Sequence, residues 1–303
     1  RLLQEFGVEP ENRVLLILED SPEWVATWLA TLKIGAVGTH AYTYLESHDY
    51  EHLLNLVRPK VVIVDKQSRA KVRAASAGLK YPRAILVAGE DVGECGPREY
   101  GLQAMLASAA DQLEVEDTHR DDIAFWNFSS GTTGKPKGTP HMQRDPLFSY
   151  ESLNYVLGYN QDDVFLKVPK LFFHYARDMG CLFPLRSGAA VILFEERTTA
   201  PLIFEMIRKY RPTVLINVPT MMRAMMQTHP DERANLSCLR LNMSSGERLS
   251  AELYEEWIKT FGVEVTDRFG SAESSIGYLC NRPGSVVPGS AGTVAPLAEV
   301  KLV

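Results

Sequence analysis

Three short polar segments combine glycine with hydroxyl, carboxylate or cationic side chains, and each follows an apolar run. The first, 129–138, reads Ser-Ser-Gly-Thr-Thr-Gly-Lys-Pro-Lys-Gly, and the others are 244–247 and 270–273. Hydroxyl and amide donors beside two lysines suit an anionic group such as a triphosphate, and glycine lets the backbone approach it closely. Since ligands bind at the carboxyl ends of strands in open α/β sheets, we expect these segments to line a binding site.

Each segment also has a plainer interpretation. The glycine spacing in 129–138 differs from the common P-loop pattern, and Pro136 disfavours helical geometry at Lys135, so this segment is predicted to stay extended. Gly, Ser and Thr are also typical of solvated turns. Segments 244–247 and 270–273 are each compatible with a tight strand-to-helix turn that needs glycine. Residue types alone leave these alternatives open.

The elements that must position these segments alternate between buried strands and amphipathic helices. The apolar run 12–18 predicts a strand, and Ser21, Pro22 and Glu23 are typical of a helix start. Further strands are expected at 36–41, 59–65, 83–88, 123–128, 163–168, 189–194, 214–218, 239–243 and 264–267. Further helices are expected at 48–57, 69–79, 102–110, 145–157, 179–185, 201–209, 220–228 and 251–261. This alternation predicts an α/β fold with parallel sheets covered on both faces by flanking helices.

The alternation restarts after about residue 160, which predicts two similar parallel-sheet lobes. The first lobe would be 1–160, including the phosphate loop, and the second 161–280, with 281–303 starting a small β subdomain. The chain begins without Met and ends in a predicted strand, so we interpret both ends as cut.

Composition restricts the classes of partner. The 303 residues contain 32 Lys and Arg against 38 Asp and Glu, a formal charge of −6, which argues against nucleic-acid binding. No apolar run reaches the length of a membrane span, so no membrane partner is expected. The four cysteines form no C-x-x-C pair, so zinc is not expected and a reduced, cytoplasmic setting is the simplest interpretation. The oligomeric state is left open, with a homodimer as one candidate.

The order of the motifs resembles one known family. Segment 128–138 resembles the phosphate loop of acyl-adenylate-forming enzymes, the superfamily of acyl-CoA synthetases, peptide-synthetase adenylation domains and firefly luciferase. Phe-Gly-Ser-Ala-Glu at 269–273 resembles that family's second core motif, aromatic-Gly-x-Thr-Glu, and Ser-Gly-Glu at 245–247 resembles its adenine-side loop. The resemblance covers essentially the whole chain. Segment 170–175 is most similar to benzoate-CoA ligases and related aryl-CoA ligases.

The resemblance implies a two-step reaction on a benzoate-like or small cyclic carboxylic acid. The carboxylate attacks the α-phosphorus of ATP to give acyl-AMP and pyrophosphate, and coenzyme A then displaces AMP. ATP, Mg²⁺ and coenzyme A are therefore the expected cofactors. Two alternatives stay open: a nucleotide- or acyl-adenylate-binding module with little or no turnover, and a peptide-synthetase-type adenylation domain.

The resemblance also implies residue roles. The residues with a catalytic role would be Thr132, Lys137 and Glu273, and Glu273 would also hold Mg²⁺. The nucleotide would be bound by Ser129, Ser130, Gly131, Thr132, Thr133, Gly134, Lys135, Lys137, Gly246, Glu247, Arg268, Phe269, Gly270, Ser271 and Ala272. The acyl group would be bound by Phe173, His174, Tyr175, Gly270 and Ile276. For His174, a purely structural role is an equally weighted alternative.

Two departures from the family pattern limit these expectations. Ala272 replaces the usual Thr and so removes a hydroxyl that contacts the α-phosphate in the family. Losing a charge-assisted hydrogen bond costs roughly 1.5–3 kcal/mol, so adenylation would slow unless Ser271 compensates. The ribose-binding Asp and the C-terminal catalytic domain with its Lys are expected to lie beyond Val303. Which acid is used, and whether coenzyme A or a carrier protein accepts it, stays open.

Overall fold

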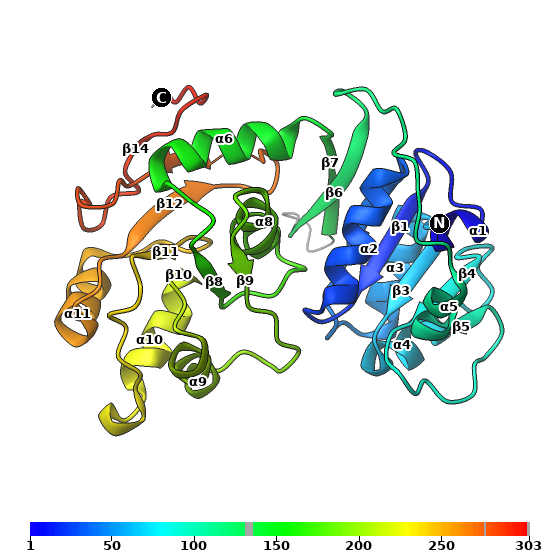
Figure 1. Ribbon diagram of the computed structural model, residues 1–303, viewed down its shortest axis with the longest axis horizontal. Helices are drawn as coiled ribbons and strands as arrows, with labels where there is room; N and C mark the ends of the chain where they lie inside the picture. The colour runs from blue at the N-terminus through cyan, green and yellow to red at the C-terminus, as the bar shows by residue number, and fades with distance from the viewer. Residues whose placement is uncertain (131–135, 276, 302–303) are drawn as a thin grey trace. The chain divides into compact units, whose positions relative to one another are not determined.

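A computed structural model describes residues 1–130, 136–275 and 277–301 (Figure 1). The chain forms two compact units, Arg1–Arg144 (unit 1) and Asp145–Val303 (unit 2). Each unit contains one sheet with helices, as the sequence predicts. The finer division at residues 160 and 280 stays a prediction about domains.

Within its described residues, unit 1 holds a seven-stranded sheet with the strand order β5-β4-β3-β1-β2-β6-β7. Neighbouring strands are parallel except for the antiparallel pair β6 and β7. The elements of unit 1 are α1 (Leu2–Glu5), β1 (Arg13–Ile17), α2 (Pro22–Lys33), β2 (Val37–His40), α3 (Ser47–Val57), β3 (Val61–Val64), α4 (Lys66–Ser76), β4 (Ala84–Val87), β5 (Glu99–Gly101), α5 (Leu102–Ser108), β6 (Ile123–Ser130) and β7 (Pro136–Met142).

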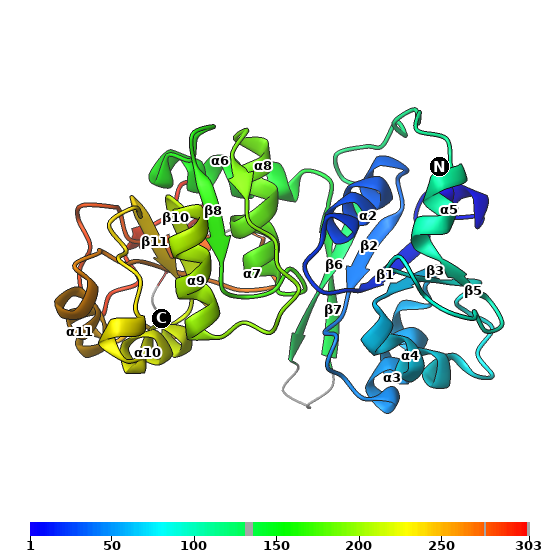
Figure 2. The ribbon, with the colours of Figure 1, turned by 60° about the horizontal axis from the view of Figure 1, so that its bottom comes forward.

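Helices cover both faces of the unit 1 sheet. The Ser21 hydroxyl accepts a hydrogen bond from the Trp24 amide at 3.2 Å and so caps α2, as predicted. Alternate residues of β1 and β3, such as Leu15 and Val62, pack against α3 and α4. Ile63, which points to the other face, lines an apolar cavity with residues of α2 and α5. Figure 2 shows the two helix pairs on opposite sides of the strands. Burial on both faces explains why these strands are continuously apolar.

Unit 2 holds a second seven-stranded sheet within its described residues, in the order β14-β13-β12-β11-β10-β8-β9. The run from β12 to β9 is parallel, whereas β13 and β14 are antiparallel to their neighbours. The elements of unit 2 are α6 (Asp145–Leu157), β8 (Val164–Lys167), α7 (His174–Arg177), the π-helix η1 (Asp178–Leu182), α8 (Phe183–Arg186), β9 (Ala190–Val191), α9 (Ala200–Tyr210), β10 (Val214–Asn217), α10 (Pro219–Gln227), the 3₁₀ helix η2 (Pro230–Glu232), β11 (Leu241–Ser244), α11 (Ala251–Phe261), β12 (Thr266–Gly270), β13 (Gly277–Cys280) and β14 (Thr293–Val294).

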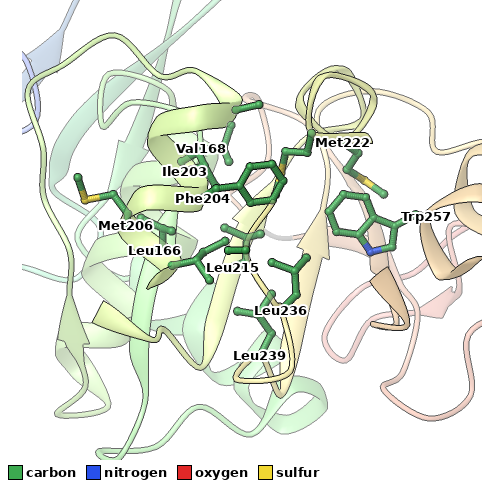
Figure 3. Packing of buried hydrophobic residues seen from close by; sticks show 14 of the residues in the cluster. Leu166, Val168, Ile203, Phe204, Met206, Leu215, Met222, Leu236, Leu239 and Trp257 are labelled. Atoms are coloured by element: carbon green, nitrogen blue, oxygen red, sulfur yellow. The ribbon is translucent and has the colours of Figure 1, made fainter. Parts of the chain in front are cut away.

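Two hydrophobic cores lie on the two faces of the unit 2 sheet. On one face, Leu166 and Leu215 pack with Phe204 and Trp257 from α9 and α11 (Figure 3). On the other face, the neighbouring strand residues pack with Tyr150, Leu153 and Leu157 of α6 and with the α7–η1–α8 segment. Leu166 and its neighbour Phe165 thus pack into the two different cores, because successive side chains of a strand point to opposite faces. This two-sided packing fixes α7 beside the carboxyl ends of the central strands.

The structure corrects four sequence-based expectations. The phosphate loop is shorter than 129–138, because β6 continues to Ser130 and β7 begins at Pro136, where the backbone is extended as predicted. Strands β5, β7 and β13 were not predicted, since none of them has an apolar alternation of its own. The strand expected at 189–194 is reduced to β9. The helix expected at 179–185 begins earlier, at His174, and passes through a π-helical stretch.

The helices are all short. Across residues 1–130, 136–275 and 277–301, none has both the length and the apolar character needed to cross a membrane. All four cysteines are free thiols, of which Cys95 is exposed.

Candidate functional site

Segment 129–138 joins two antiparallel strands of unit 1. Ser129 pairs with Lys137 across β6 and β7, and Ser130 pairs with Pro136. Lys137 is exposed. A Cβ atom at Gly138 would lie 3.1 Å from the Trp126 ring, so this glycine is needed for ring packing rather than for approach to a ligand. Strand β7 therefore presents the Lys137 cation from a position paired with β6.

Some predicted residues cannot be placed. Gly131, Thr132, Thr133, Gly134 and Lys135 lie outside the described residues, and so does Ile276. For Ser130 only the backbone pairing is described.

In unit 2, the segment after β11 is tied to the neighbouring strand and helix. The Ser245 hydroxyl donates to the Arg268 carbonyl of β12 at 3.1 Å. Gly246 has φ 86°, a conformation that glycine adopts without strain. The Glu247 carboxylate accepts hydrogen bonds of 2.8 Å from the Thr220 hydroxyl at the start of α10. These bonds fix the segment that the sequence assigns to the adenine side.

The segment after β12 carries the second predicted motif. Phe269 is 56% exposed, which leaves one ring available for stacking on a planar ligand. The Ser271 and Tyr278 hydroxyls are hydrogen-bonded at 2.9 Å. Either hydroxyl can be the donor in this bond, which ties Ser271 to β13. Ala272 is buried and Glu273 is exposed.

A cavity of about 230 Å³ lies inside unit 2, beside these two segments. Its volume suits a small acid, since pockets for drug-sized ligands usually span about 300–1,000 Å³. Seven of its described lining residues belong to the sequence-based predictions, and they are His174, Tyr175, Gly246, Arg268, Gly270, Ser271 and Ala272. The tertiary structure thus brings α7 together with the ends of β11 and β12.

The predicted substrate residues do not all meet at this cavity. Phe173 caps the start of α7 and is 36% exposed, and it is not among the described residues that line the cavity. Glu247, Phe269 and Glu273 also lie outside its lining.

Asp178 is a lining residue that the sequence analysis did not assign to the site. It lies four residues after His174, on the same face of a continuous helical segment. That helical spacing is the signal that could have found it. Its carboxylate accepts from Arg177 Nε at 2.7 Å and from Arg177 Nη2 at 3.0 Å, and Arg177 is fully buried. Asp178 therefore lines the cavity while it is paired with the buried Arg177.

Two donors at this cavity have no hydrogen-bond partner in the described structure. They are the Tyr175 hydroxyl and the Arg268 Nε, both buried. Burial raises the pKa of Tyr175, so its hydroxyl stays protonated and remains a donor. The Arg268 guanidinium lies 6.0 Å from the centroid of the Tyr175 ring. On the other face of β12, burial raises the pKa of Asp267 to about 6.

The residues present can be tested against the Mg²⁺ ion that the resemblance implies. Among the described residues, no three His, Cys, Asp or Glu side chains cluster closely enough to hold a metal ion. Mg²⁺ usually binds through one or two carboxylates while substrate phosphates and water complete its shell. A single exposed carboxylate at Glu273 fits that mode of binding.

Comparison with known proteins gives consistent matches along the chain. The family model described as AMP-binding enzyme matches residues 1–303. A benzoate–CoA ligase of Thauera aromatica is 33% identical over 98% of this chain, and a 4-hydroxybenzoate–CoA/benzoate–CoA ligase of Rhodopseudomonas palustris is 33% identical over 100%.

Solved structures agree with the sequence relatives. An anthranilate CoA ligase in complex with anthranoyl-AMP is 31% identical and superposes on 97% of this chain with a TM-score of 0.92. A benzoate CoA ligase from Burkholderia xenovorans LB400 is 33% identical, with a TM-score of 0.87. The chain spans 55–58% of the length of these four proteins.

Proposed function

Because the chain belongs to the AMP-binding enzyme family, we propose that the complete polypeptide is an ATP-dependent carboxylate–CoA ligase. We propose a benzoate-like or small cyclic acid as its substrate. The observation that carries this proposal is the cavity of about 230 Å³ between α7 and the carboxyl ends of β11 and β12. It has the size for a small acid and adjoins the two segments assigned to the nucleotide. The names of the relatives, which are benzoate, hydroxybenzoate and anthranilate ligases, support the same substrate class.

The proposed reaction has two steps. A carboxylate oxygen of the acid attacks the α-phosphorus of ATP, the bond to the β-phosphate oxygen breaks, and pyrophosphate leaves. The sulfur of coenzyme A then attacks the acyl carbonyl, loses its proton, and AMP leaves with the bonding electron pair. Two anions must meet in the first step, so charge neutralisation and positioning should dominate catalysis.

The chain's own residues would divide these tasks. Lys137, with Lys135, would neutralise the phosphates, and Glu273 would hold Mg²⁺, which supplies further charge neutralisation when bound. Gly246 and Glu247 would line the adenine, held by the bonds to Thr220 and β12 described above. The exposed Phe269 ring would stack on a planar group of the nucleotide.

Carboxylate-dependent exchange of pyrophosphate into ATP tests the first step on the complete polypeptide. A panel of benzoates and small cyclic acids is supplied one at a time, and AMP and CoA-thioester are measured in parallel. We expect at least one acid to support exchange and, with coenzyme A, a thioester. Binding of ATP without exchange for any acid in a broad panel would contradict the ligase proposal.

The same experiment examines a second candidate, an acyl-adenylate-binding module with little turnover. This candidate is favoured by one observation: Ala272 lacks the hydroxyl that contacts the α-phosphate in the family pattern. It predicts tight nucleotide binding with very slow exchange. A peptide-synthetase-type domain usually has an Asp just after the aromatic segment, which pairs with the substrate ammonium. Here Asp178 is already paired with Arg177 through both carboxylate oxygens, so it does not support that alternative.

A further inference from the structure

The Arg268 side chain brings a positive charge to the wall of the unit 2 cavity. Arg268 lies on β12, two residues before Gly270, and both residues line the cavity. Successive strand residues point to opposite faces, so Asp267 lies on the other face of the sheet. No carboxylate in the described part of the chain lies within ion-pairing distance of Arg268, and its buried Nε has no hydrogen-bond partner.

The one acidic side chain in the cavity wall does not neutralise this charge. Asp178 is bound by Arg177 through both of its oxygens, so the pair is neutral as a unit. Among the described lining residues, Arg268 is therefore left as the uncompensated charge. Burying half of a guanidinium without a partner costs desolvation free energy. A ligand carboxylate can accept two hydrogen bonds from the planar guanidinium and so offset this cost.

A second donor lies beside the guanidinium. Tyr175 is 7% exposed, lines the same cavity, and has no partner for its hydroxyl. A buried phenol normally finds an acceptor, so this hydroxyl also points to a ligand oxygen. We infer that Arg268 and Tyr175 recognise a second carboxylate on the acid substrate, so that the enzyme selects aromatic dicarboxylates. This inference rests on the proposed ligase function.

Arg268 and Gly270 both line the cavity, on the two sides of a register irregularity between Phe269 and Gly270. In the proposed function, the activated carboxylate reacts beside the 270–273 segment. An aromatic ring would then lie in the cavity, with its second carboxylate at Arg268 and the first at the reacting end. A ring hydroxyl would satisfy Tyr175 but would leave the guanidinium charge unmatched, so the structure favours a carboxylate over a hydroxyl.

Gly277 on β13 makes room for the guanidinium. A Cβ atom at Gly277 would clash with Nη2 of Arg268 and would lie 2.9 Å from its Nε. Gly277 has no left-handed backbone conformation, so alanine is compatible with its backbone. Since the clashing atoms belong to the end of a flexible side chain, Gly277→Ala should displace the guanidinium without unfolding the sheet. Gly277→Ala therefore shifts the position of the Arg268 guanidinium but does not remove its positive charge.

Binding of isophthalate, phthalate, terephthalate, 3-hydroxybenzoate and benzoate to the complete polypeptide tests the inference directly, by isothermal titration. At least one dicarboxylate should bind more tightly than benzoate and 3-hydroxybenzoate. Arg268→Met should lower this preference by about 10- to 100-fold, the range expected for a lost charge-assisted hydrogen bond. Gly277→Ala should lower it in the same direction. Arg223→Met, which removes an exposed arginine of α10, is the matched control and should leave the preference unchanged.

The outcomes separate the two proposals. A preference for benzoate or 3-hydroxybenzoate over every dicarboxylate would overturn the inference, and so would a dicarboxylate preference that survives both Arg268→Met and Gly277→Ala. A weaker affinity for ATP in Arg268→Met, with unchanged acid preference, would place the guanidinium at the nucleotide and would also overturn it. Pyrophosphate exchange with the same acids tests the ligase function separately. An Arg268-dependent preference without exchange would refute the ligase proposal and keep the acid-binding role.

Discussion

Replacing Glu99 with glutamine should destabilise unit 1 in a pH-dependent way. The Glu99 side chain is fully buried at the start of β5. Its carboxylate accepts from Arg69 at 2.7 Å, from Arg73 at 2.6 and 2.7 Å, and from the Gly96 amide at 2.9 Å. Burial alone would raise the pKa of Glu99, but these donors outweigh it and lower the pKa from 4.5 to about 2.

The lowered pKa of Glu99 gives the size of the expected loss in unfolding free energy. Lowering the Glu99 pKa from 4.5 to about 2 corresponds to roughly 3 kcal/mol of stabilisation of the folded state. Arg73 is half exposed, so water screens part of this interaction, and we expect a loss of about 2–3 kcal/mol in Glu99→Gln. Since the folded pKa lies below the unfolded pKa, the stabilisation is fully present above pH 4.5 and is lost as the pH falls towards 2.

Urea unfolding of the wild type and of Glu99→Gln measures this difference. Hydrogen exchange at the β4 amides follows unit 1 separately from unit 2. The difference in unfolding free energy should be largest at neutral pH and should shrink steadily below about pH 4.5. Glu94→Gln, an exposed carboxylate in the same segment, is the control and should change stability little. A difference for Glu99→Gln that stays constant as the pH falls would refute the reasoning.

Three further changes address the proposed reaction in the complete polypeptide. His174→Ala should alter the ranking of substituted benzoates by about 10-fold while leaving the KM for ATP nearly unchanged; an unchanged ranking in the exchange assay would mean that His174 is structural. Lys137→Ala should slow pyrophosphate exchange by about 100-fold or more, because it removes charge from the phosphates, and retained exchange would exclude that role. Ala272→Thr should speed acyl-AMP formation by about 10- to 100-fold, as measured by single-turnover kinetics, if a hydroxyl there binds the α-phosphate. No gain would show that the enzyme does not depend on it.

The fold was largely predictable because its helices and central strands have strong local signals. The apolar run of β1 and the Ser21 cap of α2 each depend only on residues that are adjacent in sequence. The structure confirms both. Strands β7 and β13 were missed because neither has an apolar alternation of its own. Each is held by antiparallel pairing with the strand just before it in the chain, β6 for β7 and β12 for β13, and not by an apolar pattern of its own.

The candidate site divides in the same way. The sequence by itself determined the motif segments, since their glycines, hydroxyls and charges are contiguous and occur in a recognisable order. Only the tertiary structure decided which of these side chains meet. It placed Arg268 and Tyr175 on one cavity, left Phe173 outside that lining, and added Asp178 as a paired carboxylate. The physical reason is that α7 and β12 are far apart in sequence and are brought together only by the packing of helices on the parallel sheet.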